Sequence, residues 1–282
     1  MRFKVYSELS YEVITATTFI FNIQAAASAS QIIISESLAI IPAMPFEEFT
    51  LKNSSTRFVK MEVNQGQFFT IIYQAEIDVF HTVYHEKTLV QSTPIIKLDN
   101  EVVPFIAPSR HCESDKLSEF ATKEFGFLPN EYTTVKAINE WIFKTIEYKT
   151  GVSNASTSAC DTLLRREGVC KDFAHLGIAL CRALDIPARY FTGYAYNLNP
   201  PDFHACFEAY IGGQWLFFDP TKLASPNGLV KIANGKDASE VAVASYFGDV
   251  NCRFMKIECH CSTADFTPFN SGVDTAVAIS YD

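Results

Sequence analysis

Along the first third of the chain, apolar and polar residues alternate with a period of two, which is typical of β-strands with one buried face. The alternation is clear in residues 3–15, and residues 68–83 form a second stretch rich in isoleucine, valine and aromatic side chains. Clusters of turn-forming residues at 52–55 and 64–66 separate the apolar runs. Helical periodicity is nearly absent before Pro108. The pattern therefore predicts a β-sandwich in this part of the chain.

After Pro108 the apolar residues take the period of helices. Residues 114–125 and 132–146 carry apolar side chains three and four positions apart, which predicts two amphipathic helices. A third helix is predicted to begin at Cys170 and to end before Pro187, which cannot continue it.

Strands are predicted again from Arg189 onward, and Gly212 and Gly213 mark a hairpin turn between two of them. Helices followed by antiparallel strands are typical of an α+β fold, with the helices packed on an antiparallel sheet. We therefore predict two domains, a β-sandwich over residues 1–107 and an α+β domain over residues 108–282.

Composition and charge narrow the classes of partner. Of the 282 residues, 48% are hydrophobic and 20% are charged, which excludes a disordered chain and supplies a core for each domain. The 23 basic and 32 acidic residues give a formal net charge of −9. Such a charge repels nucleic acid and anionic membrane surfaces. We therefore expect neither among the partners, and the sequence indicates no particular oligomeric state.

The cysteines and the N-terminal segment indicate in which cellular compartment the protein works. The eight cysteines form no compact spacing of the kind that staples small secreted domains. Residues 13–35 carry no charge and include a run, AAASA, that could pass for a signal-peptide cleavage site. However, Glu8 and Glu12 lie where a signal peptide is basic, and the polar residues of the segment also argue against a membrane helix. We predict a reduced, cytoplasmic chain rather than an exported one.

Cys170 is the first candidate for chemistry. It follows Gly168 and opens the third predicted helix, so that the free backbone N–H groups of the helix start point toward its sulfur. The positive end of the helix dipole favours the thiolate, which is the nucleophilic form of the side chain. The alternative is a buried structural cysteine, the commoner fate of this residue type.

The predicted hairpin brings a histidine and an aspartate together. If the loop at Gly212 and Gly213 has two or four residues, paired positions sum to 425, and Cys206 faces Asp219. His204 then lies on the same face as Asp219, one diagonal step away and within side-chain reach. A loop of three residues would place the two on opposite faces, because side chains alternate along a strand.

Three separated runs, EGVCKDFAHLGIALCRALDIPAR, HACFEAY and WLFFDPT, carry a resemblance to a known family. Together they resemble the transglutaminase-like superfamily in its bacterial branch, which includes cysteine proteases. The tail KIANGKDASEVAVASYFGD resembles the bacterial extension of that family, and the opening MRFKVYSELSYEV resembles its N-terminal β-sandwich domain. The resemblance implies a papain-like core in the second domain.

By this resemblance Cys170 is the nucleophile, His204 the base and Asp219 the acid that orients it. The implied activity is hydrolysis of amide bonds in a peptide or protein through a thioester, with no cofactor and no metal. Two alternatives stay open: a protein-glutamine transglutaminase, which transfers the acyl group to an amine, and a catalytically silent interaction protein. The backbone N–H of Cys170 is one expected oxyanion donor, and the second is not assigned.

One departure from the family concerns substrate choice. The family usually has tryptophan two residues after the histidine, where this chain has Cys206. The smaller side chain is expected to open a wall of the site to solvent. This favours water over an amine as the acceptor.

Other candidate residues are assigned to structure. Cys252, Cys259, His260 and Cys261 suggest a metal cluster, but alternation along a strand turns His260 away from its neighbours, and no second ligand pair has tetrahedral spacing. His175 is expected to pack within its helix and Asp172 to complement the helix start. The resemblance implies that Arg189 ties the helix exit to the sheet.

Overall fold

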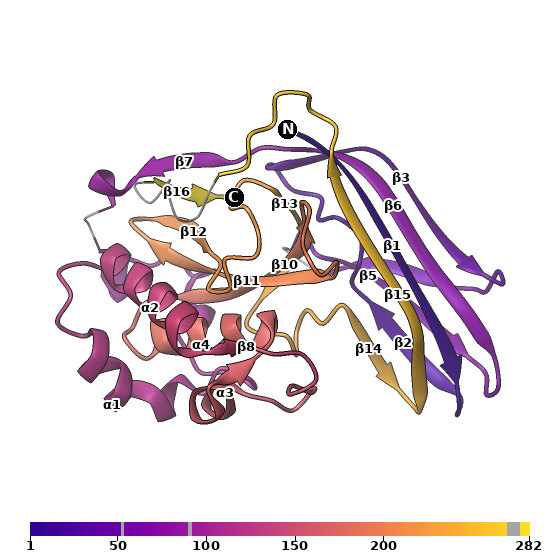
Figure 1. The fold of residues 1–282 in the computed structure, drawn as a ribbon, viewed down its shortest axis with the longest axis horizontal. Coiled ribbons are helices and arrows are strands. Elements are labelled where there is room, and N and C mark those ends of the chain that lie inside the picture. The colour runs from indigo at the N-terminus through magenta and orange to yellow at the C-terminus, as the bar shows by residue number, and fades with distance from the viewer. Residues whose placement is uncertain (52–53, 90–91, 270–276) are drawn as a thin grey trace.

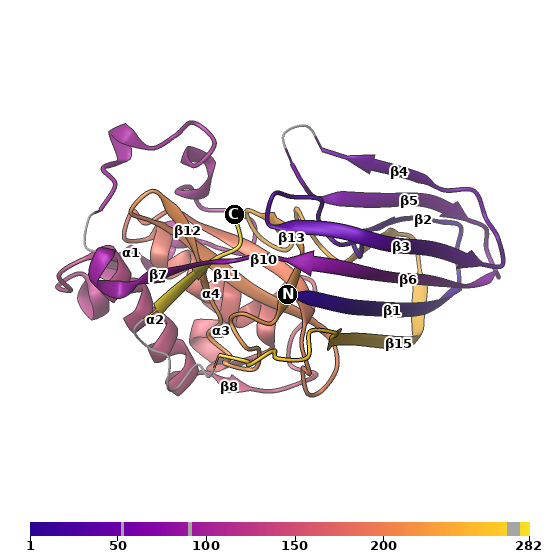
Figure 2. The same ribbon diagram turned by 90° about the horizontal axis from the view of Figure 1, so that it is seen from above.

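A computed structural model gives the fold, and the description covers residues 1–51, 54–89, 92–269 and 277–282. The N-terminal part is a sandwich of two four-stranded sheets (Figures 1 and 2). In order across each sheet, the first holds β15 (Val250–Cys261), β1 (Arg2–Val13), β6 (Phe68–Val79) and β3 (Gln31–Ile41), and the second holds β14 (Ala244–Phe247), β2 (Thr17–Phe21), β5 (Arg57–Val63) and β4 (Glu47–Thr50).

Aromatic side chains join the two sheets. The ring of Tyr11 on β1 lies 5.4 Å from that of Phe19 on β2 and 5.8 Å from that of Phe21, measured between centroids. All three side chains are buried, because the alternating pattern turns them to the inner face. The predicted β-sandwich is confirmed.

The sandwich also takes strands from the far end of the chain. β15 pairs antiparallel with β1 and β14 with β2, so residues 244–261 lie in the N-terminal layers rather than in the core (Figure 1). In this respect the strand pairing differs from the predicted division between 1–107 and 108–282. Local periodicity cannot reveal it, because the pairing joins segments more than 200 residues apart.

The core packs helices against a third antiparallel sheet, as the predicted α+β fold requires. The helices are α1 (Ser114–Phe125), α2 (Glu131–Thr145), α3 (Ala159–Arg165) and α4 (Cys170–Arg182). The sheet has the order β12 (Gln214–Phe218), β11 (Phe203–Ile211), β10 (Ala188–Ala195) and β13 (Leu229–Gly235).

Short elements complete the core. Two further strand pairs are β8 (Glu147–Tyr148) with β9 (Glu167–Gly168), and β16 (Val277–Ser280) with β7 (Thr82–His85). Three turns of 3₁₀ helix, η1 (Glu86–Thr88), η2 (Ile95–Lys97) and η3 (Val103–Phe105), lie in the connection between the sandwich and α1. In the described residues no helix is both long and apolar enough to cross a membrane.

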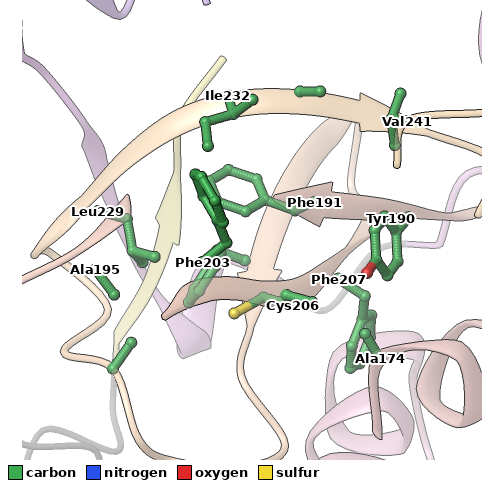
Figure 3. Close-up of a cluster of buried hydrophobic side chains, with 14 of the residues drawn as sticks. Ala174, Tyr190, Phe191, Ala195, Phe203, Cys206, Phe207, Leu229, Ile232 and Val241 are labelled. Atoms are coloured by element: carbon green, nitrogen blue, oxygen red, sulfur yellow. The ribbon is translucent and has the colours of Figure 1, made fainter. Parts of the chain in front are cut away.

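Helix α4 is the centre of the core, and it packs closely on β11. A Cβ atom added at Gly177 would lie 2.6 Å from Cε1 of Phe207, so only glycine allows the helix this approach. Figure 3 shows Phe207 beside Ala174 of the helix, within a cluster of buried aromatic and aliphatic side chains. This packing fixes the start of α4 relative to the strands that carry His204 and Asp219.

Candidate active site

The start of α4 places Cys170 at the junction of strand and helix. Val169, just before it, is extended, with φ −113° and ψ −179°. Its backbone N–H donates to Oδ2 of Asp172 at 2.9 Å, so Asp172 satisfies a helix-start donor as predicted. A Cβ at Gly168 would lie 2.8 Å from Cβ of Asp172, which explains the glycine. Cys170 itself is half-buried.

The β11–β12 hairpin has the register predicted for a two-residue loop. Phe207 pairs with Phe218, and Ile211 pairs with Gln214, so paired positions sum to 425. Gly212 and Gly213 form the turn with φ +60° and +83°, the left-handed region that glycine adopts without strain.

This register brings His204 and Asp219 into contact. Nε2 of His204 lies 2.8 Å from Oδ2 of Asp219, and both side chains are buried. The other oxygen of Asp219 accepts bonds from the backbone N–H and the hydroxyl of Thr221, at 2.9 and 2.6 Å. Oδ2 also accepts the N–H of Ala224 at 3.0 Å. The carboxylate therefore holds the turn after β12 as well as the imidazole.

The second ring nitrogen of His204 is left for Cys170. A hydrogen bond joins the two side chains, and Asp219 occupies Nε2. Burial opposes protonation of the ring, but the charges of Cys206 and Asp219 and the hydrogen bonds to Asp219 and Cys170 outweigh it and raise the pKa of His204 well above its ordinary value. The site therefore favours the protonated form of the imidazole.

Of the two charges, Asp219 is the one that acts at neutral pH. Burial is the main cause that raises the pKa of Cys206 to about 12, so its thiol is uncharged at pH 7. Burial also disfavours the charged form of Asp219, yet the charge of His204 and the hydrogen bonds to the carboxylate lower its pKa overall.

A cavity of about 330 Å³ opens beside Cys170 and His204. It lies between the core and the sandwich, because strands of both contribute to its walls. Most of its lining is apolar, including Leu9, Tyr11, Val169, Phe203, Val241 and Met255. A hollow of this size accommodates one large side chain of a substrate.

Comparison with known proteins identifies the family. Residues 1–101 match the family model described as bacterial transglutaminase, N-terminal domain, and residues 119–220 match the transglutaminase-like superfamily. The chain is 49% identical to a "putative cysteine protease" from Cytophaga hutchinsonii of known crystal structure. The match covers 100% of this chain and 98% of that one, with a TM-score of 0.97. The chain belongs to the transglutaminase-like superfamily.

Mycobacterial relatives match over a shorter stretch. An uncharacterized protein of Mycobacterium leprae is 31% identical over 117 residues, which is 38% of this chain and 42% of that protein. One of Mycobacterium tuberculosis is 31% identical over 146 residues, 45% of this chain and 46% of that protein. The match thus spans less than half the length of these curated relatives.

The structure corrects the expectation for Cys206, where the superfamily usually has tryptophan. Its sulfur lies within 4.8 Å of ligand atoms of His204 and Asp219, so the side chain is on the predicted face. However, Cys206 is 0% exposed and is enclosed by the cluster of Figure 3. It therefore opens no wall to solvent, because other side chains of the core fill the space around it.

The three side chains could in principle hold a metal ion, since His204, Cys206 and Asp219 each offer a ligand atom. Both oxygens of Asp219 already accept protein hydrogen bonds, and Nε2 of His204 is one of the donors. The donor set thus fits a hydrogen-bonded network better than a metal cage. A metal would have to break at least one of these bonds.

Tyr148 is a site residue that sequence reasoning missed. Strand β8 pairs it with Gly168, two residues before Cys170. The backbone N–H of Cys170 bonds the Tyr148 hydroxyl; burial and the charge of Cys170 nevertheless raise the pKa of Tyr148 to about 12. The hydroxyl is therefore protonated at neutral pH. A strand of two residues leaves no periodic signal by which to place it.

Other residues that the sequence assigns to structure do lie in structural roles. His175 is buried, stacks on His111 with centroids 4.9 Å apart, and accepts the N–H of Ala238 at Nε2. Arg189 bonds Glu208 and Asp282, which ties β10 to the end of the chain. In β15, Cys259 is buried and His260 is exposed, as the predicted alternation requires.

We expect Cys170 to be the fastest of the eight thiols to react with iodoacetamide at pH 7, because its side chain is half-exposed at the cavity and is bonded to the His204 imidazole, which can take its proton. Burial is the main cause that raises the pKa of Cys112 to about 12 and that of Cys160 to about 11, which slows both. Time-resolved labelling mapped by mass spectrometry measures the rates. Exposed Cys252 is the internal reference: His204→Ala should slow Cys170 and leave Cys252 unchanged. Faster labelling of Cys160 than of Cys170 would contradict the expectation.

Proposed function

We propose that the protein is a cysteine hydrolase that cleaves amide bonds in a peptide or protein substrate. Cys170 is the nucleophile, His204 the acid and base, and Asp219 the group that orients the ring. The observation that carries the proposal is the pair of contacts on one buried imidazole, with Asp219 on one nitrogen and Cys170 bonded to the ring. The likeness to a chain described as a "putative cysteine protease", at 49% identity over 100% of this chain, supports it.

The steps follow from the protonation states favoured at the site. The Cys170 thiolate attacks the amide carbonyl carbon, and a C–S bond forms. The C–N bond breaks as protonated His204 gives its proton to the leaving amine. Water then attacks the thioester while His204 takes a proton from it. The C–S bond breaks, and the acid product leaves with the thiolate restored.

We assign the Tyr148 hydroxyl as the second oxyanion donor, beside the backbone N–H of Cys170. In the resting site these two groups bond each other. A developing oxyanion at the carbonyl oxygen would replace that bond and accept from both. Phe173 packs on the Tyr148 ring, with centroids 5.8 Å apart, and helps to hold it in place.

Replacing Tyr148 with phenylalanine should lower kcat for peptide cleavage by about a hundredfold, because one oxyanion donor is lost. KM should change little, since the bond forms only in the transition state. The matched control is Tyr84→Phe, which removes a hydroxyl that bonds Gln214 on an exposed strand. A rise in KM at constant kcat would instead assign Tyr148 to substrate binding.

Hydrolysis and transfer to an amine share the same thioester, and the acceptor decides between them. We expect water rather than an amine to attack the thioester, because Cys170 lies half-exposed beside the cavity. Incubation with reduced, unfolded casein and a fluorescent primary amine tests this: fragments should appear on mass spectrometry, with little covalent amine. The Cys170→Ala variant is the control. Amine incorporation that depends on Cys170 would make the protein a transglutaminase. An inert, unlabelled Cys170 would favour the silent interaction protein.

We further propose a cytoplasmic location and retain the two-domain division as a proposal. All eight cysteines are free thiols, which suits a reducing compartment. Fractionation of cells with an antibody against the protein tests the location.

A further inference from the structure

Strand β14 has a free edge. It is the outermost strand of its sheet and pairs with β2 on one side only, within the described residues. Paired positions of β14 and β2 sum to 265, and the N–H of Asn22 donates to the carbonyl of Val243 in the same register, at 2.9 Å.

The hydrogen bond between Asn22 and Val243 determines which backbone groups of β14 point to its free edge. In an antiparallel ladder, residues alternate between pairs that exchange hydrogen bonds and pairs that do not. Val243 belongs to a bonded pair, so Ser245 and Phe247 also direct their backbone groups to β2. Ala244 and Tyr246, which lie opposite Phe21 and Phe19, therefore direct their N–H and C=O groups to the free edge.

The free edge faces the candidate active site. Ala244 lines the cavity that holds Cys170 and His204, and it also lines a second hollow of about 510 Å³ that contains Tyr246. The two hollows adjoin, because they share four lining residues, Lys171, Ala238, Ala242 and Ala244. In Figure 1, β14 is the strand of its sheet that lies toward the core.

Large apolar side chains are exposed around this edge. Phe247 is 67% exposed and Tyr246 51%, and both line the second hollow. Met255 on β15 is 45% exposed and lines the cavity beside Cys170. An apolar surface that continues into a catalytic cavity marks a binding site for a chain that must reach the nucleophile.

We propose that the substrate binds as an extended polypeptide that adds a strand to the free edge of β14. Its main chain bonds the N–H and C=O groups of Ala244 and Tyr246. It places a large apolar side chain in the cavity beside Cys170. This inference rests on the proposed function and names its substrate class. The occupant is a substrate rather than a second copy of the chain, because the edge is continuous with the cavity that holds the nucleophile.

Backbone methylation of a bound peptide tests the ladder. Binding of a fluorescent decapeptide library to Cys170→Ala identifies the tightest peptide. A quenched-fluorescent version of it tests cleavage by the unaltered chain, and we expect the cut next to a large apolar residue. Binding of that peptide and its N-methylated versions to Cys170→Ala is then measured by fluorescence anisotropy. Methylation of either of two peptide amides that lie two residues apart and face β14 should weaken binding about threefold to tenfold. Methylation of the amide between them should not, because that amide points away from β14. A uniform effect, or none, overturns the proposal.

Proline at the edge supplies the reciprocal test. Ala244→Pro removes an outward N–H without removing a bond to β2, so the strand should remain. It should weaken peptide binding about threefold to tenfold, and by more than Ala244→Ser, which alters the same side chain but keeps the N–H. Cys170 labelling and thermal unfolding check the fold; if the proline variant is unfolded, the methylation pattern alone decides.

The outcomes separate this inference from the proposed function. Cleavage without the alternating methylation pattern would support the hydrolase and contradict binding at the β14 edge. The alternating methylation pattern without cleavage would support binding at the β14 edge and contradict the hydrolase. A dimer that Ala244→Pro dissociates, with peptide binding unchanged, would assign the edge to self-association and overturn the inference.

Discussion

Replacing Cys170 or His204 with alanine is expected to lower kcat/KM for peptide cleavage by at least about a thousandfold in each case, and the double variant should be no slower than the slower single variant. The two side chains act as one hydrogen-bonded pair, so losing either removes the nucleophilic thiolate. Non-additivity of this kind distinguishes a joint role from two independent ones. Measurement needs one peptide substrate and initial rates for the four proteins.

The control for this experiment is a thiol outside the site. Cys160 lies on α3 and is half-buried, so Cys160→Ala alters a cysteine of similar exposure without touching the imidazole. Its rate should equal that of the unaltered protein. Additive losses in the double Cys170 and His204 variant would show that the two residues contribute separately, which the mechanism does not allow.

Local signals in the sequence predicted much of the fold. The helical spacing over residues 114–125 predicts α1 with the bounds that the structure has, and the helix predicted to open at Cys170 after Gly168 is α4. The β11–β12 register is one of those that the glycines at 212 and 213 allow. The structure has the two-residue turn, whereas a loop of three residues would place His204 and Asp219 on opposite faces.

What the sequence did not predict depends on contacts between distant segments. β14 and β15 join the N-terminal sheets through pairs such as Val5 with Cys259, and no periodic pattern encodes the partner of a strand. Cys206 was placed on the correct face, but its complete burial depends on packing around it. The role of Asp219 in holding the turn through Thr221 and Ala224 was also invisible, because it requires coordinates.

Asp219 bonds His204 and also holds the turn after β12, so its replacement by alanine and by asparagine should affect stability differently. Asp219→Ala leaves the N–H groups of Thr221 and Ala224 buried without an acceptor, and we expect a loss of about 3–5 kcal/mol in the free energy of unfolding. Asp219→Asn keeps one oxygen for Thr221 and should lose about 1–3 kcal/mol, because its amide group then meets the N–H of Ala224. Chemical denaturation at pH 7 measures both. Equal losses would mean that the carboxylate does not hold the turn.

The same replacement by asparagine should lower turnover by about 10³- to 10⁴-fold through the tautomer of His204. The amide group can only donate to Nε2, so the ring proton moves to Nδ1, and the ring can no longer take a proton from the Cys170 thiol. Nitrogen-15 NMR of histidine-labelled protein detects the change directly. Burial raises the pKa of Asp219, but His204 and the hydrogen bonds lower it overall, so the stability advantage of aspartate over asparagine is present above the ordinary carboxyl pKa of 3.8 and is lost as the pH falls below it. An advantage that persists in acid would show that the charge of Asp219 contributes nothing, and that the site is held by shape alone.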